Sequence, residues 1–557
     1  MRGGRDSTNI FITQLIFVLM SLSRYYHTVR YLKFEQLFFQ IFYKLCARIR
    51  RLLGSKEKYV SYKHGNEIKF LPFPEKRISY KGDTTFEFLN LSHKFNGMWN
   101  DRSLGDLWRY NLNYMDFILQ PGMDVRDALS WIMDFIDAVP KNTIATDPYP
   151  ISLRGMNWIK FLSMHRAELS MEQLFKIESS LYSQYRILYK RTERHLLANH
   201  YLENGFSLLF AAVYFHDTAF WKKAKHIVGH QLKEQIMNDG AHYELSPMYH
   251  CIILERILDC CNLLHNVDDT FFDGLSELRL IIREKASRML SWLDAIVLPG
   301  DNIPLLNDSA NGVSLSPEEL RRYAKTIGLE CGLGELGDSG YRRVIRPDYV
   351  ALLDMAPLGA SYNLGHAHAD SSTFLLWVNG RELIADTGTS TYNSGKQRDY
   401  ERSTRAHNTV VVDDENSSNV WGAFRCAQRA QTIIKEDGPI VYAMEHNGYC
   451  RKGVKCNRRF VCNENSFEIE DCILSKKQSK AEAFFHLSPE VQVISVDDNR
   501  VVTDRAVFVF EGHSSLHLSK VNVAYEYNLL SSTQCIKVRF ADRLRTIING
   551  FGNTSGS

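Results

Sequence analysis

The sequence is poor in three features, and each shortage excludes a class of protein. Its long apolar run has only thirteen residues, Ile10–Leu22, which is too short to cross a bilayer and argues against a polytopic membrane protein. The net charge is only +3, from 67 basic and 64 acidic residues, so the basic footprint of a nucleic-acid binder is missing. There is no short internal repeat or low-complexity tract, and 45% hydrophobic residues are typical of an ordinary globular protein.

Cysteine is also scarce for a disulfide-stabilised protein. Eleven cysteines in 557 residues are an odd number in a long chain, which argues against a disulfide framework. Cys450, Cys456 and Cys462 recur every six residues and would share one face of an extended strand. Zinc sites need two to four residues between paired cysteines, so this spacing favours core packing.

The amino terminus allows two interpretations. Ile10–Leu22 follows Arg2 and Arg5 and has the length of a signal-peptide core, but no small-residue cleavage site follows it. We expect the cell envelope or periplasm if this run acts as a signal, and the cytoplasm if translation starts at Met20. The next stretch is basic and aromatic at helical spacing, which predicts either a helix packed on the body or an interfacial helix. A peripheral membrane contact through residues 10–53 is therefore one expectation.

The pattern of apolar residues changes once along the chain. From about Leu104 to Leu290 the periods are helical, and Ser246-Pro247 has the cap and first-turn residues that begin a helix. After a stretch rich in turn residues, Pro299–Gly340, the period drops towards two, and Asn379-Gly380 between apolar runs predicts a hairpin.

These periods predict an α+β multidomain protein. The helices indicate a bundle, solenoid or toroid, and the closely spaced strands indicate an antiparallel β-sandwich. We divide the chain into an apolar and basic segment at 1–60, a helical domain at 85–335 and a β domain at 340–557.

Two clusters in the helical half could carry chemistry. Asn199, His200, Glu203 and Asn204 gather just before an apolar helix, although a capping sequence would look the same. Tyr249 falls in the first turn after Ser246-Pro247, where the positive end of the helix dipole favours a phenolate and hence a base. A tyrosine that only packs is the alternative.

Two further clusters lie in the β half. His366, His368 and Asp370 alternate on one face of extended chain, and imidazole with carboxylate is a common metal-ligand set, although a polar loop is the alternative. The second cluster contains His407 and arginines that could hold carboxylates or sulfates bidentately. Salt bridges and a core histidine are its alternatives.

The clusters, taken in order, resemble the heparinase II/III-like polysaccharide lyases. The similarity covers about Leu104–Asp413 and rests on an ordered set of motifs. These are Leu107–Leu112, Tyr149–Trp158, Gly365–Asp370 (Gly-His-Ala-His-Ala-Asp), Asp386–Thr389 (Asp-Thr-Gly-Thr) and Arg405–Val410 (Arg-Ala-His-Asn-Thr-Val). The resemblance implies an incomplete (α/α) toroid followed by an antiparallel β-sandwich, with the cleft between them. It also implies β-elimination at a uronic acid residue of a heparan sulfate-, alginate- or exopolysaccharide-like substrate.

The resemblance also implies roles for residues at matching positions. Asn199 would neutralise the substrate carboxylate, His200 would be a base, Tyr249 would protonate the leaving oxygen, and His366 would reach into the cleft. Glu203 and Tyr392 resemble a neutralising acid and a second cleft tyrosine. Substrate-binding candidates are Arg154, Asn157, Arg402 and Arg405. One structural zinc ion per chain would be held by His368, Asp386 and His407.

Two other functions remain open from the sequence. The first residues resemble family members associated with surface-polysaccharide production, so a non-catalytic or weakly catalytic carbohydrate-binding protein is the main alternative. A toroid glycoside hydrolase would need paired carboxylates, for which Asp239 and Glu244 are available. Histidine and tyrosine dominate the clusters, which favours the lyase.

Overall fold

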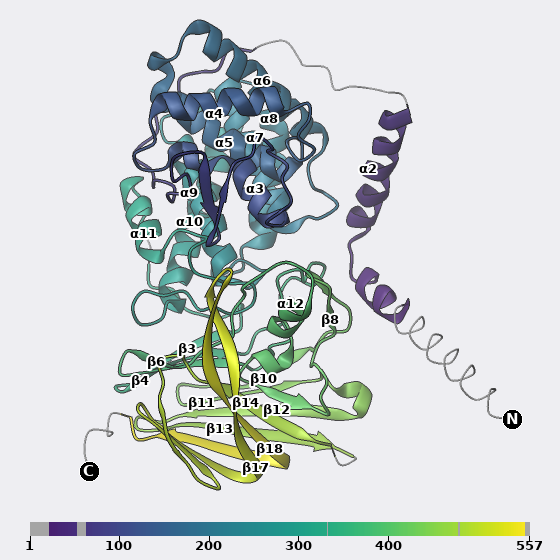
Figure 1. Cartoon of the computed structure of the whole chain (residues 1–557), viewed down its shortest axis with the longest axis vertical. Helices are drawn as coiled ribbons and strands as arrows, with labels where there is room; N and C mark the ends of the chain where they lie inside the picture. The colour runs from purple at the N-terminus through teal and green to yellow at the C-terminus, as the bar shows by residue number, and fades with distance from the viewer. Residues whose placement is uncertain (1–21, 53–62, 331, 477–478, 552–557) are drawn as a thin grey trace, which may run out of the picture.

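The computed structural model describes residues 22–52, 63–330, 332–476 and 479–551, and it confirms the predicted fold class (Figure 1). The first half is helical apart from the short hairpin β1–β2 (Thr85–Phe88 and Leu91–Lys94). Its helices are α3 (Asp106–Tyr114), α4 (Val125–Ala138), α5 (Pro148–His165), α6 (Met171–Lys190), α7 (Ala198–Phe215), α8 (Thr218–Gln235), α9 (Pro247–Leu263), α10 (Leu275–Ile296) and α11 (Pro317–Thr326). They pack in succession as the incomplete (α/α) toroid.

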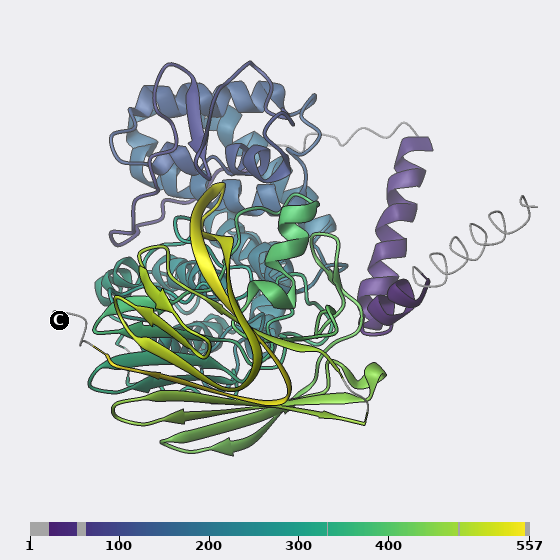
Figure 2. The ribbon, with the colours of Figure 1, turned by 60° about the horizontal axis from the view of Figure 1, so that its bottom comes forward.

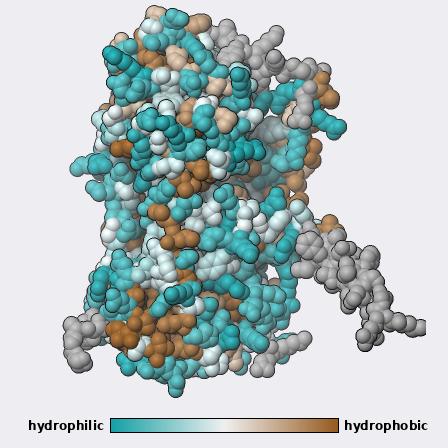
Figure 3. All heavy atoms as spheres, in the orientation of Figure 1, coloured by the Kyte–Doolittle hydropathy of each residue, from teal (hydrophilic) through white to brown (hydrophobic). Residues whose placement is uncertain are grey.

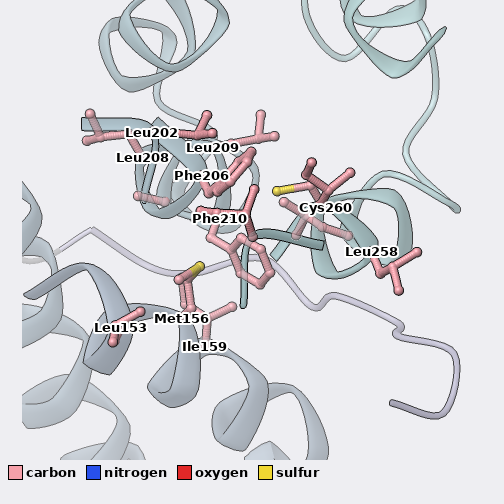
Figure 4. Close-up of a cluster of buried hydrophobic side chains, with 14 of the residues drawn as sticks. Leu153, Met156, Ile159, Leu202, Phe206, Leu208, Leu209, Phe210, Leu258 and Cys260 are labelled. Atoms are coloured by element: carbon pink, nitrogen blue, oxygen red, sulfur yellow. The ribbon is translucent and has the colours of Figure 1, made fainter. Parts of the chain in front are cut away.

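Local sequence explains where the helices begin and which of them are central. The predicted start of α9 is confirmed, because the Ser246 hydroxyl accepts a hydrogen bond from the Tyr249 N–H at 3.2 Å and Pro247 occupies the first turn. Helix α7 is apolar on nearly all sides, so it is buried among its neighbours. Figure 4 shows side chains of α5, α7 and α9, among them Met156, Phe206 and Leu258, meeting in one shared core.

The described part of the second half contains two large antiparallel sheets that face each other and a small two-stranded sheet of β8 (Val420–Trp421) and β9 (Arg425–Cys426). One has the order β3-β4-β5-β6, and the other has β10-β11-β12-β13-β18-β17-β16-β15 with β14 and β7 attached. Phe374 of the first sheet lies 5.4 Å, centroid to centroid, from Phe467 of the second, within a common core. The strands are β3 (Tyr341–Ile345), β4 (Tyr349–Asp354), β5 (Phe374–Val378), β6 (Arg381–Ile384), β7 (Val410–Val412), β10 (Thr432–Asp437), β11 (Val441–His446), β12 (Val454–Cys462), β13 (Phe467–Ser475), β14 (Ala481–His486), β15 (Val493–Val496), β16 (Arg500–Thr503), β17 (Val507–Glu526) and β18 (Leu529–Asn549). A sandwich results, as predicted.

The hairpin predicted at Asn379-Gly380 joins β5 to β6. Both residues have positive φ, 49° and 73°, as a two-residue turn with the twist of the strands requires. The cysteine prediction holds only in part, because Cys456 and Cys462 are buried in β12 while Cys450 is exposed in the preceding turn. Cys450 is on a short 3-10 turn, so the strand periodicity does not apply to it.

The long hairpin β17–β18 connects the two halves. It rises from the sandwich to the helical half in both views (Figures 1 and 2). At its tip, the Asn311 N–H donates to the Tyr525 carbonyl at 2.7 Å, and the Asn90 side chain donates to the Tyr527 carbonyl at 3.0 Å. A second contact between the halves is apolar, because Trp292 of α10 packs against Tyr341 of β3. The halves are thereby held around the site described next.

The N-terminal segment lies to one side of both halves. Of the run Ile10–Leu22, only Leu22 falls within the described residues, so the predictions of a signal peptide or a start at Met20 concern residues outside them. Residues 22–29 are helical and precede α2 (Phe34–Leu52). Among the helices that the structure describes, none is both long and apolar enough to cross a membrane.

Candidate active site

A carboxylate that sequence reasoning did not assign to this site links the two halves. Glu244, in the loop before α9, accepts hydrogen bonds from the Asn199 side-chain amide at 3.1 and 3.2 Å and from the Asn199 backbone N–H at 3.1 Å. Its other face lies 3.6 Å from Nε2 of His366, which belongs to the β half. The Asn199 side-chain oxygen is buried and has no hydrogen-bond partner in the part of the chain that the structure describes. Asn199 and His366 therefore meet across Glu244.

His200 stands beside this pair with its own carboxylate partner. Its Nδ1 lies 3.2 Å from Glu193, and its side chain is 37% exposed. Asn204 fixes Glu193 by donating to its carboxylate at 3.1 Å and accepting from its N–H at 2.7 Å. Burial lowers the pKa of His200, but Glu193, together with Glu244 and Glu203, outweighs this effect and raises the pKa overall. The arrangement is a histidine oriented by an acid.

Tyr249 faces His366 from the start of α9. The two rings lie 3.9 Å apart between centroids, and the Tyr249 hydroxyl is 3.3 Å from the Tyr392 hydroxyl. Burial raises the pKa of the Tyr249 hydroxyl, so this environment disfavours the phenolate that the helix dipole would favour. Tyr249 therefore holds its proton and is suited to donate it.

Asp308 is the buried centre of the β side of the site. One of its oxygens accepts from His366 Nδ1 at 2.9 Å, the other accepts from His368 Nε2 at 2.9 Å, and Arg398 donates to both. Burial alone would raise the pKa of Asp308, but Arg398 and the histidines hold it well below its usual range. An ionised Asp308 thus orients His366 towards Tyr249.

Three residues with a strained backbone conformation lie directly before residues that build the site. Ala198, Leu245 and Asn307 have φ of 51°, 57° and 54°, in the left-handed region that non-glycine residues seldom adopt. They come directly before Asn199, the cap residue Ser246 and Asp308. Backbone strain of this kind is concentrated at functional sites, where surrounding structure maintains it.

Glu203 is placed differently from what the family resemblance suggests for a residue touching substrate. It is fully buried, and its closest cation is Arg256 of α9 at 3.6 Å. Burial raises the pKa of Glu203 to about 7, and neither of its oxygens has a hydrogen-bond partner among the residues described. Glu203 lies under the site rather than in its open part.

Aromatic rings extend the site on the helical side. Tyr110, Tyr114, Tyr149 and His200 form a row with successive centroid distances of 6.4, 5.9 and 4.5 Å. On the β side, Phe424 is 45% exposed and lies 6.1 Å from His366. Flat apolar faces beside polar groups are suited to stacking against sugar rings.

The three predicted metal ligands lie together inside the sandwich. Asp386 accepts from His407 Nδ1 at 2.7 Å, and the His407 and His368 rings are 5.2 Å apart. All three side chains are buried, and His368 Nδ1 and His407 Nε2 have no hydrogen-bond partner within the described ranges. Across the described ranges, no three His, Cys, Asp or Glu side chains are arranged as a ready metal-binding group.

Two predicted substrate-binding arginines need correction. Arg154 is fully buried and donates to Gln184 and to the carbonyls of Asn113 and Ala145. Arg402 is likewise buried and donates to the Ala367 and Gly422 carbonyls. Both guanidiniums are used to fix loops, and burial lowers their pKa, to about 9 and about 10.

The other two substrate-binding candidates are also placed away from the linked cluster. Asn157 is buried and donates to the Tyr114 carbonyl at 3.0 Å and to Asp116 at 2.5 Å. Arg405 is 44% exposed and lies 3.7 Å from Asp414. In the described part of the chain, no hydrogen bond or ion pair connects Arg405 with Asn199, Tyr249 or His366.

Sequence reasoning missed Glu193 and Asp308 and considered Glu244 only as a hydrolase acid. Glu193 lies seven residues before His200 in a turn, so no periodicity connects them. Asp308 lies in the Pro299–Gly340 stretch, which gave a boundary signal and no site signal. Only the folded chain brings these carboxylates to the histidines.

Family models match both halves of the chain. Residues 58–327 match the family model described as the heparinase II/III N-terminus, and residues 332–546 match heparinase II/III-like, C-terminal. The chain belongs to the heparinase II/III family. It is 23% identical over 410 residues to a heparin-sulfate lyase of Bacteroides stercoris, covering 64% of this chain and 60% of the relative. A heparin-sulfate lyase of Pedobacter heparinus is 26% identical over 257 residues, covering 40% and 38%.

Solved structures support the family fold. Heparinase III superposes with a TM-score of 0.60 at 18% identity, covering 81% of this chain and 77% of that one. A heparan sulfate lyase from Pedobacter heparinus gives 0.55 at 18% identity, covering 85% and 82%. The chain spans less than two thirds of the curated relatives that it matches in sequence. The fold and family are therefore established, and the activity is argued from the site.

Proposed function

We propose that the protein is a polysaccharide lyase that cleaves a uronic-acid-containing polysaccharide by β-elimination. The observation that carries the proposal is the convergence of Asn199, Tyr249 and His366 from the two halves, with His200 adjacent to Asn199. Carboxylate stabilisation and proton transfer need groups of these types in one place. The two relatives in the curated comparison are heparin-sulfate lyases, which favours a heparan sulfate-like substrate.

The reaction can be written with these side chains. The Asn199 amide would hydrogen-bond the substrate carboxylate and stabilise the charge that develops when C5 loses its proton. His200 would accept that proton, and the electron pair would form the C4–C5 double bond as the C4–O bond breaks. Tyr249, kept protonated by burial, would give its proton to the leaving oxygen, with the Tyr392 hydroxyl 3.3 Å away to share it.

His366 would act as the group that positions and polarises Tyr249. Its Nδ1 is fixed by Asp308 at 2.9 Å, and its Nε2 faces Glu244 at 3.6 Å. Held between these two carboxylates, the imidazole ring is fixed 3.9 Å, centroid to centroid, from the ring of Tyr249. The role differs from that of His200, which is partly exposed and has one acid partner.

We also propose one structural zinc ion per chain, held by His368, Asp386 and His407. Two buried ring nitrogens without hydrogen-bond partners support this proposal, because two imidazoles and a carboxylate form a donor set that zinc accepts. Asp386 is bonded to His407 Nδ1, so it would have to share or give up that contact as a ligand. Zinc would supply a fixed link between the strands that hold the His366 loop.

The test of the lyase proposal is a substrate screen. The purified chain would be incubated with heparan sulfate, alginate, hyaluronan and a glucuronate-containing exopolysaccharide, and the ultraviolet absorbance of the unsaturated product followed. A rise with at least one of them supports the lyase. Binding to a polysaccharide without any rise would favour the carbohydrate-binding alternative, for which the aromatic row from Tyr110 to Tyr149 would suffice.

The proposal includes peripheral contact with a membrane through the described part of residues 10–53. Exposed aromatic and aliphatic side chains on α2, such as Phe34 and Ile41, support it. The same helix also packs on the body, so the two interpretations of the sequence are compatible.

A further inference from the structure

Helix α2 has an apolar stripe that the described part of the protein leaves open. Its seven side chains are spaced three or four residues apart, with one adjacent pair, and are 43–82% exposed. At about 100° per residue they fall within about 100° of the helix circumference. Figure 3 shows brown, hydrophobic atoms along this helix at the right edge of the molecule. The stripe consists of Phe34, Phe38, Ile41, Phe42, Leu45, Ile49 and Leu52.

The neighbouring side of α2 is fixed to the body. The Gln36 amide donates to the Leu196 carbonyl at 3.2 Å, and the Tyr43 hydroxyl donates to the Thr192 carbonyl at 2.7 Å. Glu35 pairs with Arg194 at 2.6 Å. These contacts occupy a different arc of the helix, so the apolar stripe is not the surface that holds α2 in place.

The preceding turn continues the same kind of surface. Leu22, Tyr25 and Tyr26 are 51–66% exposed. Tyr25 packs edge-on against Trp421 of the β half at 5.1 Å, and the Trp421 ring N–H donates to the Thr28 hydroxyl at 3.2 Å. The segment is thus anchored on both halves of the protein.

The segment of residues 22–52 is strongly basic. Residues 22–52 contain seven basic residues and one acidic residue, Glu35, which is paired with Arg194. Arg24, Arg30, Lys44 and Arg48 are exposed. An apolar stripe flanked by basic side chains is the pattern of a helix that lies in the headgroup region of an anionic bilayer.

The geometry points to an anionic membrane surface as the partner of this face. Helix α2 is about 28 Å long at 1.5 Å per residue and lies parallel to the bilayer plane. Its apolar stripe is buried at the boundary between the lipid headgroups and the acyl chains. Lys44 and Arg48 reach the lipid phosphates. Since the segment is fixed to Thr192 and Trp421, the whole protein stands on the surface in one orientation. This inference rests on the proposed membrane contact and is independent of the lyase chemistry.

The experiment is co-sedimentation of the full chain with vesicles. One set contains phosphatidylcholine alone, and the other contains equal parts of phosphatidylcholine and phosphatidylglycerol. The test variant is Ile41→Gln/Leu45→Gln/Ile49→Gln, since glutamine preserves helix propensity. Its matched control, Ile78→Gln/Leu280→Gln/Ile433→Gln, removes three comparably exposed apolar side chains from the body. A second pair compares Lys44→Gln/Arg48→Gln with Arg322→Gln/Lys325→Gln on α11.

We expect the wild type and both controls to sediment with the anionic vesicles. Partitioning should fall about a hundredfold in the stripe variant and about 20-fold in the Lys44/Arg48 variant, and added salt should weaken it. Turnover of a soluble oligosaccharide should stay unchanged in these variants, which separates this test from that of the lyase. The inference is overturned if the wild type remains in the supernatant, or if stripe and control variants sediment equally. It is also overturned if light scattering shows a dimer that the stripe variant dissociates, because a second copy then covers the stripe.

Discussion

His366 and His368 are two residues apart and bind the two oxygens of one carboxylate, yet they lie in different environments. His366 is 13% exposed, stacks on Tyr249 and faces Glu244. His368 is fully buried, its ring lies 5.2 Å from that of His407, and its Nδ1 has no hydrogen-bond partner among the described residues. Alternation along extended chain explains the shared direction, and the packing of the loop decides which ring reaches the site. Asp308 therefore connects the proposed catalytic residues, through His366, to the buried interior of the β half, through His368.

The largest expected effect is a loss of turnover when Tyr249, which packs against His366, is changed. Tyr249→Phe removes the hydroxyl and keeps the ring, so we expect turnover to fall about a hundredfold or more while the melting temperature changes little. The measurement is kcat on a confirmed substrate, with Tyr442→Phe, a half-buried tyrosine of β11, as control. Wild-type turnover in Tyr249→Phe would remove this residue from the mechanism. Combining it with Asn199→Ala should cost less than the sum if both serve one step.

On the structural side, His407→Ala should act mainly on stability. It leaves the buried Asp386 without its hydrogen-bond partner at 2.7 Å, and breaking such a pair costs about 3 kcal/mol. Thermal unfolding and metal analysis would check it, with loss of about one zinc per chain expected. If purified wild type contains no divalent metal and chelators leave its melting unchanged, the zinc proposal fails.

A buried histidine far from the site, His446, should make the stability of the protein depend on pH. Burial lowers the pKa of His446 to about 4, so between about pH 6.5 and 4 the unfolded chain binds a proton that the folded chain does not. Stability therefore falls as pH falls through this window, by about 2 kcal/mol at pH 5 for this group. Denaturant unfolding of wild type and His446→Gln should differ in slope against pH there. Parallel curves would contradict this assignment.

The smallest expected effect concerns the carboxylate that joins Asn199 to His366. Glu244→Ala removes the acceptor of the Asn199 amide, and we expect kcat/KM to fall about tenfold. Glu244→Gln keeps an acceptor and should recover most of the loss. A purely structural role predicts that both variants change melting without this difference in kcat/KM.

Much of the architecture could be predicted from local sequence. Ser246-Pro247 and Asn379-Gly380 specify a helix start and a hairpin through backbone preferences that act over a few residues. The motifs around Asn199 and His366 likewise located the site. Local patterns could not show that Arg154 and Arg402 turn inward, because their burial depends on carbonyls that distant loops supply.

The carboxylates of the site illustrate the same limit. Glu193, Glu244 and Asp308 are separated by tens of residues and converge only when the helices and the sandwich pack together. Burial also raises the pKa of the Tyr249 hydroxyl, and the position of Tyr249 in the first turn of a helix does not reveal that burial. Exposure of the α2 stripe depends likewise on which face of the helix meets Thr192.

The central claim is that the bond breaks by elimination, and digestion in water enriched in heavy oxygen tests it most directly. The substrate is the polysaccharide that gives an absorbance rise, and mass spectrometry reads the products. The account predicts unsaturated ends and no heavy oxygen from the solvent at the cleaved bond. Saturated products, with one solvent oxygen taken up per cleaved bond on one of the two new ends, would show hydrolysis and contradict the account.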